Sequence, residues 1–336
     1  MKLLRYIVFP LVPFYYLVTW LRNKLYDLGL KSSTRFDVPV ICVGNLSVGG
    51  TGKTPMTEYL IRLLKNDYKI ATLSRGYKRK TNGFVVADET MNVLDMGDEP
   101  FQFYKKFNGI IVSVDTDRRH GIGRLLALKN KPDVILLDDA FQHRKVKAGF
   151  NILLTAYDNL YCNDMVLPTG NLREPKSGAK RADVIVVTKC PKFISGTEKQ
   201  QIIDSLKPLE HQSVFFSSIV YSDKIKNSFE EKKLQDLQDK MFTLVTGIAN
   251  AKPLVDFLHT EGLKFEHLSF KDHHEFSEKD IKYLKAKGLI VTTEKDFVRL
   301  KPFFKNSNSM FYLPIETNLS NAKKFDTLIE KFITSF

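Results

Sequence analysis

A glycine-rich segment between two apolar stretches carries the clearest chemistry in this sequence. Residues 38–43 are typical of a buried strand, and residues 56–64 have the apolar spacing of a helix. The order strand, glycine loop, helix is that of a phosphate-binding P-loop, whose backbone N–H groups surround phosphate oxygens. We therefore predict that a nucleotide phosphate is bound by Ser47, Val48, Gly49, Gly50, Thr51, Gly52, Lys53 and Thr54.

Two side chains of this loop have specific expected roles. Lys53 would reach the β- and γ-phosphates, and the Thr54 hydroxyl would bind Mg²⁺. The general motif has Gly where this chain has Ser47. An ordinary glycine turn before a surface helix is the alternative, but strand, glycines, Lys-Thr pair and helix all favour the P-loop.

A second apolar strand, residues 132–137, ends in Asp138 and Asp139. Carboxylates at such a position hold Mg²⁺ in P-loop proteins, whereas alone they would be typical of a turn or a helix cap. Gln142 and His143 follow and would lie at the carboxyl end of the sheet, where α/β proteins bind ligands.

Further polar side chains follow other predicted strands, and each has a plainer interpretation. Arg75 could contact phosphate or substrate, or simply be solvated, in a segment that also contains Tyr77. Arg118 and Arg119 belong to a basic cluster that suits an anionic substrate, although charged loop residues are usually only solvated. Asp98 stands at a helix start, where a carboxylate is at least as often a cap.

In the second half of the chain, His273 lies beside Asp272, an arrangement that can tune a base. A metal site is less convincing there, because the H-E-x-x-H spacing is absent. Residues 188–191 resemble the guanine-binding signature of GTPases, but Pro191 replaces its deciding Asp, which weighs against GTP.

Composition narrows the class of protein. The chain has 336 residues, 43% hydrophobic and 26% charged, which is typical of a globular protein with two domains. Its three cysteines have no paired spacing, so neither a disulfide framework nor a zinc site is expected, and a reducing cytoplasm fits. The net charge of +13 favours a polyanion: nucleic acid, anionic membrane or a phosphorylated substrate.

The N-terminus favours a membrane surface. Residues 6–21 carry no charge, are mostly apolar, and are flanked by lysines and arginines. These 16 residues are fewer than the ~20 that cross a bilayer, and Pro10 and Pro13 disrupt a straight helix. Aromatic side chains with flanking cations suit the headgroup region, with a core-packing helix as the alternative.

From residue 38 onward, apolar strands alternate with helices, which indicates a parallel sheet covered on both faces. The stretch 158–180 is rich in Pro and Gly and interrupts this alternation. We predict an N-terminal segment 1–30, a P-loop domain 31–157, a linker or active-site loop 158–180, and a smaller α/β domain 181–336.

Taken together, these motifs resemble the tetraacyldisaccharide 4'-kinase (lipid A 4'-kinase) family almost from end to end. Ser47 departs from the general P-loop motif, and the family resembles this chain in that departure. The matching segments are the N-terminus and residues 44–55, 73–77, 97–100, 138–143, 172–175, 245–249, 272–273 and 293–296.

The resemblance implies two α/β/α sandwich domains, the first with a P-loop NTPase-like parallel sheet, and an N-terminal interfacial helix. It implies Mg²⁺-dependent transfer of the ATP γ-phosphoryl to the 4'-hydroxyl of a tetraacyldisaccharide 1-phosphate, which makes lipid IVA. The reaction would occur at the cytoplasmic face of the inner membrane, on a peripheral or monotopic enzyme, with no nucleic acid as partner.

The resemblance also assigns roles to single residues. Asp98 and His273 fall on the family's base assembly, and Arg173 and Glu174 fall on its Arg-Glu-Pro motif near nucleotide and metal. At Ala251 many relatives continue from Asn with Pro, whereas here Pro253 comes two residues later, so the ligand role of that turn is open.

Three alternatives remain from the residues alone. The first is a membrane-associated P-loop ATPase that acts as a switch or partitioning module, which a requirement for a sugar–lipid acceptor would distinguish. A GTPase is disfavoured by Pro191, and a nucleic-acid-binding protein is suggested only by charge.

Overall fold

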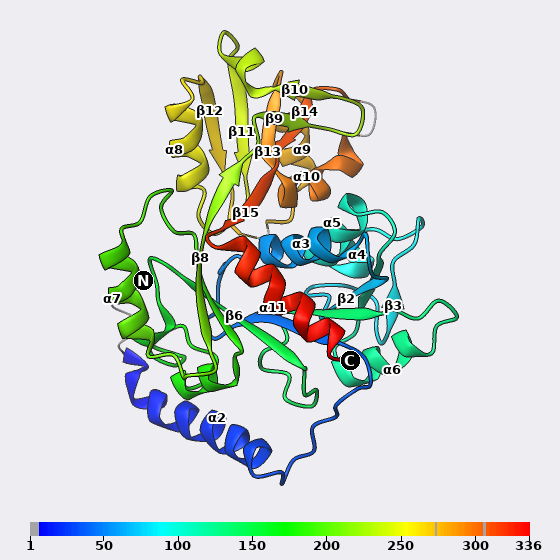
Figure 1. Cartoon of the computed structure of the whole chain (residues 1–336). Coiled ribbons are helices and arrows are strands. Elements are labelled where there is room, and N and C mark those ends of the chain that lie inside the picture. The colour runs from blue at the N-terminus through cyan, green and yellow to red at the C-terminus, as the bar shows by residue number, and fades with distance from the viewer. Residues whose placement is uncertain (1–6, 273, 305–306) are drawn as a thin grey trace. The chain divides into compact units, whose positions relative to one another are not determined.

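The computed structural model describes residues 7–272, 274–304 and 307–336 (Figure 1). The chain divides into two compact units. The first unit comprises Met1–Ile219 and Thr317–Phe336, and the second comprises Val220–Glu316. The chain therefore leaves the first unit once, near residue 219, and returns to it for its last 20 residues.

The first unit is built on a nine-stranded sheet. In spatial order its strands are β15 (Ile315–Leu319), β8 (Ser213–Tyr221), β7 (Val184–Thr188), β6 (Phe150–Ala156), β1 (Val40–Asn45), β5 (Val134–Asp138), β2 (Ile70–Ser74), β4 (Ile111–Val114) and β3 (Val85–Val86). The strands from β8 to β4 are parallel, and β3 pairs antiparallel with β4. The P-loop strand β1 lies between β5 and β6, so ligand-binding segments reach it from both sides.

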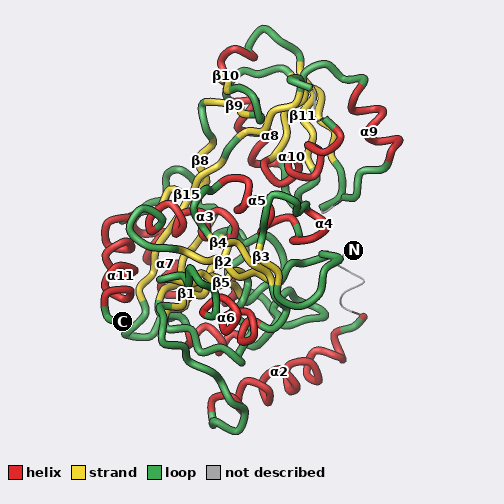
Figure 2. The backbone as a smooth tube through the Cα atoms, turned by 90° about the vertical axis from the view of Figure 1, so that its right-hand side faces the viewer, coloured by secondary structure: helices red, strands yellow, loops and turns green. Residues whose placement is uncertain are grey.

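Helices cover both faces of this sheet (Figure 2). One face carries α3 (Lys53–Leu64), α5 (Asp98–Lys106) and α11 (Ala322–Thr334). The other carries α2 (Val12–Asp27), α6 (Arg118–Leu126) and α7 (Gly196–Leu206). A single turn, α4 (Val93–Met96), precedes α5. All six residues of β1 are buried, because helices cover both faces of the sheet at this strand.

The second unit has its own six-stranded sheet, β10 (Glu231–Lys233), β9 (Lys224–Lys226), β14 (Met310–Leu313), β13 (Ile290–Thr293), β11 (Phe242–Thr246) and β12 (Phe265–Ser269). Its helices are α8 (Lys252–Thr260), α9 (Glu278–Lys285) and α10 (Glu294–Leu300). Leu244 packs with α8 in one apolar cluster, and its neighbour Val245 packs with α9 and α10 in another. Both units are therefore α/β/α sandwiches, which confirms the predicted fold class.

The structure places the boundary between the units later than the predicted residue 181. Strands β7 and β8 extend the first sheet, and the C-terminal helix α11 returns to it. Phe325 of α11 is fully buried and makes edge-to-face contacts with Tyr59 of α3 and Phe215 of β8. A continuous apolar strand looks the same in either sheet, so composition could not tell to which sheet β7 belongs.

The N-terminal segment forms the helix α2, preceded by a single 3₁₀ turn at Phe9–Leu11. Among the described residues, no helix combines the length and the hydrophobicity needed to cross a bilayer. The partly buried Val12 and Tyr15 of α2 pack against the core of the first unit. The helix predicted from the apolar N-terminus is thus present as a feature of the first unit.

Candidate active site

The P-loop runs from the end of β1 to the first turn of α3. Gly49 and Gly52 have φ angles of 107° and 83°, in a backbone region that residues with a Cβ rarely adopt. Gly52 directly precedes the first helical residue, Lys53. These glycines turn the chain so that the loop enters the helix N-terminus, where free N–H groups and the helix dipole favour an anion.

Side chains outside the loop hold it in place. Asn45 Nδ2 donates to Thr51 Oγ1 at 2.6 Å, and Thr188 Oγ1 donates to the Thr51 carbonyl at 2.8 Å. The backbone N–H of Val48 donates to the Asn171 carbonyl at 2.8 Å. The loop is therefore fixed from β1, from β7 and from the segment 164–175.

Gly44 explains how the end of β5 approaches this loop. A Cβ added at Gly44 would lie 2.5 Å from the Cβ of Phe141. Only glycine admits the segment that follows Asp138 and Asp139 so close to β1, and this brings both carboxylates to the P-loop.

The pKa values of the two adjacent carboxyl groups are shifted in opposite directions. Burial, followed by the charges of Asp139 and Glu99, raises the pKa of Asp138 to about 7. Burial also opposes ionisation of Asp139, but Lys53 and Arg173 outweigh it and lower the pKa of Asp139. Asp139 is therefore the ionised member of the pair over the whole neutral range.

Arg173 closes this cluster. Its Nη1 and Nη2 donate to the two oxygens of Asp139 at 3.2 and 2.7 Å, and Nη2 also contacts Asn45 Oδ1. Lys53 Nζ lies 3.8 Å from Asp139 Oδ1. One carboxylate thus orients both cations that face the loop, in the bidentate geometry that suits an arginine.

Asp138 is the carboxylate that fits a cation. It is 6% exposed, its Oδ2 accepts from Ser74 at 3.3 Å, and its Oδ1 is buried and accepts no hydrogen bond from the described residues. Buried polar atoms normally have a partner, so this oxygen suits Mg²⁺. Within the described ranges no three acidic, His or Cys side chains form a metal cluster, and Mg²⁺ commonly takes one or two carboxylates plus substrate phosphates.

Glu174, predicted to lie near the metal, is fully buried and hydrogen-bonded through both oxygens. Oε2 accepts from Asn23 of α2 at 2.5 Å. Oε1 accepts from Gln142 at 2.9 Å and from Arg181 at 2.8 Å. In this conformation the carboxylate ties α2 to the site and presents no free oxygen to the loop.

Arg118, predicted as a substrate contact, faces backbone carbonyls, and His143, also predicted as one, contacts the Arg118 N–H and lies 3.5 Å from the Asp117 carboxylate. Arg118 is 3% exposed and donates to the carbonyls of Asp115, Thr116, Asp138 and Asp139 at 3.3–3.4 Å. His143 Nε2 accepts from the Arg118 N–H, and burial, followed by the charge of Arg118, lowers the pKa of His143. Both side chains brace the end of β5.

The remaining predicted contacts are spread around the carboxyl edge of the sheet. Arg75, Tyr77 and Arg119 are exposed there. Asp98 is the first residue of α5 and Thr54 the second of α3, each partly exposed.

His273 lies outside the described residues. Its neighbour Asp272 belongs to the second unit and is 3.5 Å from Lys295 Nζ. Nearby in the sequence, the buried Asp296 accepts from the Gly247 N–H at 2.8 Å and from Thr293 at 2.7 Å. The Thr293–Asp296 motif therefore shapes a strand–helix turn within the second unit.

Two residues beside the loop escaped the sequence interpretation. Thr188 anchors the loop, and Lys189 Nζ would lie 3.8 Å from a Cβ at Gly50, with its pKa lowered by burial. The signal was present in residues 188–191, which resemble a nucleotide-binding signature. The missing Asp argued against guanine but not against a place beside the phosphates.

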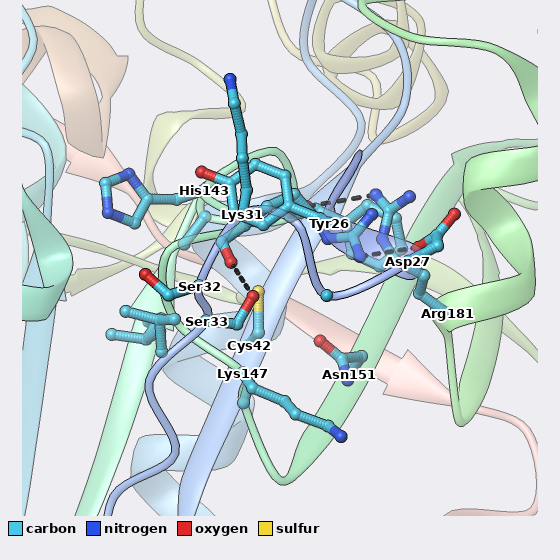
Figure 3. A pocket seen from close by; sticks show the side chains of 17 residues that line it. Tyr26, Asp27, Lys31, Ser32, Ser33, Cys42, His143, Lys147, Asn151 and Arg181 are labelled. Atoms are coloured by element: carbon cyan, nitrogen blue, oxygen red, sulfur yellow. Dashed lines mark hydrogen bonds and ion pairs between the residues drawn. The ribbon is translucent and has the colours of Figure 1, made fainter. Parts of the chain in front are cut away.

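A cavity of about 690 Å³ lies elsewhere in the first unit (Figure 3). It is lined by the last turn of α2, by the loop that follows, and by parts of β1, β5 and residues 140–148, with Cys42, His143 and Arg181 among the labelled side chains. No P-loop residue lines it. It is thus separate from the proposed phosphate site.

Comparison with known proteins shows a family that the whole chain resembles. A family model described as LpxK, tetraacyldisaccharide-1-P 4'-kinase, matches residues 4–334. The tetraacyldisaccharide 4'-kinase of Flavobacterium psychrophilum is 53% identical over 100% of this chain and 98% of its own. That of Bacteroides fragilis is 46% identical over 89% of this chain and 85% of its own.

A solved structure is similar over the whole chain. It is LpxK from Aquifex aeolicus, an "apo" form in complex with ATP, with a TM-score of 0.79 and 31% identity. The match covers 98% of this chain and 99% of that one.

The raised pKa of Asp138 gives a test of its burial. Without metal, the folded protein binds a proton at Asp138 up to about pH 7, whereas the unfolded chain releases it near the ordinary value of 3.8. Stability contributed by this group is therefore lost as pH rises from about 4 to 7, by at most about 1.4 kcal/mol per pH unit. In EDTA, we therefore expect the unfolding temperature of Asp138→Asn, relative to that of wild type, to rise as the pH increases from about 4 to 7.

Above pH 7 the gain should stay constant, because Asp138 is then ionised in both states. The exposed Asp88→Asn is the matched control and should show no such rise. A difference between Asp138→Asn and wild type that does not change between pH 4 and 7 would contradict the raised pKa.

Proposed function

This chain belongs to the tetraacyldisaccharide 4'-kinase family, and we propose that its P-loop unit transfers the ATP γ-phosphoryl to the 4'-hydroxyl of an acylated disaccharide 1-phosphate. The family model, the curated relatives and the ATP-bound solved relative all support a kinase of lipid A biosynthesis. The main support for the proposed site is the P-loop geometry, together with the charged side chains of Lys53, Arg173 and Asp139 that lie beside it.

Phosphoryl transfer needs positioning and charge neutralisation more than covalent chemistry. The loop N–H groups and Lys53 would hold the β- and γ-phosphates, and Arg173 adds a second cation fixed by Asp139. Mg²⁺, when bound, would neutralise phosphate charge. We assign Asp138 and Thr54 as its protein ligands, since the oxygens of Asp139 face Arg173 and Lys53.

The acceptor hydroxyl needs a base, and we propose Asp98 for this role with His273 as the residue that positions it or tunes its pKa. Support comes from the family motif and from the position of Asp98 at the start of α5, on the same sheet edge as the P-loop. Arg75, Tyr77 and Arg119 are proposed contacts of the anionic substrate, because they are exposed on that edge.

We further propose that α2 lies in the headgroup region at the cytoplasmic face of the inner membrane. Phe14, Leu17 and Trp20 are 70%, 55% and 41% exposed, respectively. An apolar helix face of this kind suits a lipid surface, and the net charge of +13 suits anionic headgroups and an anionic acceptor.

Loss of the P-loop lysine tests the kinase assignment. We expect Lys53→Ala to lower kcat/KM by about 10³-fold or more, because the transferring phosphoryl loses a preorganised cation. The measurement is transfer of radiolabelled γ-phosphate from ATP to the acylated disaccharide 1-phosphate in detergent. Lys65→Ala, an exposed position at the end of the same helix, is the control. Near wild-type transfer by a folded Lys53→Ala protein would sink the assignment, and hydrolysis without transfer in wild type would favour the ATPase switch.

A double-mutant cycle tests the proposed base. Asp98→Ala and His273→Ala should each lower kcat by about 10²-fold or more with little change in ATP affinity. Because they would act as one unit, the double variant should be little worse than the poorer single variant. Glu275→Ala is the control. Multiplicative losses would show independent roles, and lost stability with normal kcat would make Asp98 a helix cap only.

Charges on the outer face of α2 test the membrane proposal. Leu17→Glu with Trp20→Glu should reduce sedimentation with anionic vesicles several-fold, because carboxylates do not enter the interface. Phe229→Glu, an exposed apolar position in the second unit, is the matched control. Unchanged sedimentation of the α2 variant, or a tag at Met1 found across the membrane, would contradict the interfacial assignment.

A further inference from the structure

The helix α2 is oriented with its apolar side chains outward and one polar side chain inward. The only buried residue among its 16 is Asn23. Large apolar residues of the helix are exposed, with Phe14 at 70% and Leu17 at 55%. A helix that merely completed the core would bury its apolar face, so the buried contact of Asn23 calls for another explanation.

The partner of Asn23 lies in the segment 171–174, which carries Arg173 and borders the P-loop. Asn23 Nδ2 donates to Glu174 Oε2 at 2.5 Å, across 151 residues of sequence. Tyr15, two turns earlier on α2, donates its hydroxyl to the Arg173 carbonyl at 3.1 Å. Two inward side chains of α2 therefore hold two consecutive residues, Arg173 and Glu174.

The same short segment is paired with the P-loop on its other side. The Arg173 N–H donates to the Leu46 carbonyl at 2.7 Å, and the Asn171 carbonyl accepts from the Val48 N–H at 2.8 Å. The Arg173 side chain then binds both oxygens of Asp139. A continuous set of contacts runs from α2 through residues 171–174 to the P-loop and Asp139.

Burial makes the Asn23 contact consequential. Glu174 is 0% exposed, and Gln142 and Arg181 both donate to its Oε1. Asn23 is the described donor to Oε2. A buried carboxylate oxygen that loses its donor is costly, so the segment would shift to recover one. Arg173, which directly precedes Glu174 in the chain, would shift with this segment.

We propose that Asn23 is a positioning residue for phosphoryl transfer. Its hydrogen bond to Glu174 fixes residues 171–174, so that Arg173 meets Asp139 beside the nucleotide phosphates. The orientation of α2, which carries the apolar outer face, thereby governs turnover. This inference rests on the proposed kinase function and assigns Glu174 to coupling rather than to the metal.

The test exchanges the two partners. In Asn23→Asp two carboxylates face each other, and in Glu174→Gln the Arg181 guanidinium loses the buried carboxylate that it faces, so kcat for transfer should fall by about 10- to 100-fold in each. In the double variant, the amide oxygen introduced at position 174 still accepts from Gln142 and Arg181, while the amide nitrogen donates to the carboxylate introduced at position 23. Transfer should recover to within about threefold of wild type, with KM for ATP changing less than kcat throughout.

Two further variants separate positioning from folding and from membrane binding. Asn23→Ala introduces no charge but leaves Glu174 Oε2 without its donor, so it should lower the unfolding temperature while remaining folded, keep wild-type vesicle sedimentation, and lose kcat. Lys24→Ala, the exposed neighbour on α2, is the matched control for turnover and should keep the wild-type kcat. If either exchange single variant fails to fold, the Asn23→Ala result decides.

Three results would overturn the inference. The first is wild-type kcat in folded Asn23→Ala or in both exchange single variants. The second is a double variant no better than Glu174→Gln. The third is a Glu174→Gln defect cured by excess Mg²⁺, which would make Glu174 a metal ligand. Transfer by wild type tests the proposed function separately; if wild type only hydrolyses ATP, the same ratios are measured by hydrolysis.

Discussion

The bidentate pair between Arg173 and Asp139 is the contact on which the proposed nucleotide site depends. It joins a segment 34 residues further along the chain to the end of β5, beside Asn45 of the P-loop strand. Together with Lys53 it keeps Asp139 ionised next to Asp138, whose pKa is raised first by burial and then by the charge of Asp139. Removing the Arg173 guanidinium would shift the pKa of Asp139 and, through the charge of Asp139, also that of Asp138.

This pair also explains why the P-loop needs support from outside its own motif. Glycines with left-handed φ angles give the loop its turn but no rigidity. Thr188, Asn45 and Asn171 supply hydrogen bonds to its backbone or to Thr51. A site that must hold phosphates in line for transfer gains from such preorganisation, because no energy is then spent on ordering the loop during the reaction.

The helix α2 has two faces with different tasks. Its outer face is apolar and suits a lipid surface, while its inner face hydrogen-bonds Arg173 and Glu174. An enzyme whose acceptor carries acyl chains must act where that acceptor resides. A helix that meets the surface on one side and the catalytic segment on the other can connect location with turnover through a few buried hydrogen bonds.

The sequence alone determined the local elements that carry the proposed phosphate site. Strand β1, the glycine loop, α3 and the Asp138–Asp139 pair follow from local patterns, because apolar runs and glycines set nearby backbone conformation. Only the tertiary structure decided that β7, β8 and α11 complete the first sheet, since burial on both faces looks alike in either unit. Tertiary structure also decided that Arg118 braces backbone carbonyls and that Glu174 meets Asn23, because hydrogen bonds across 151 residues leave no periodic trace in a sequence.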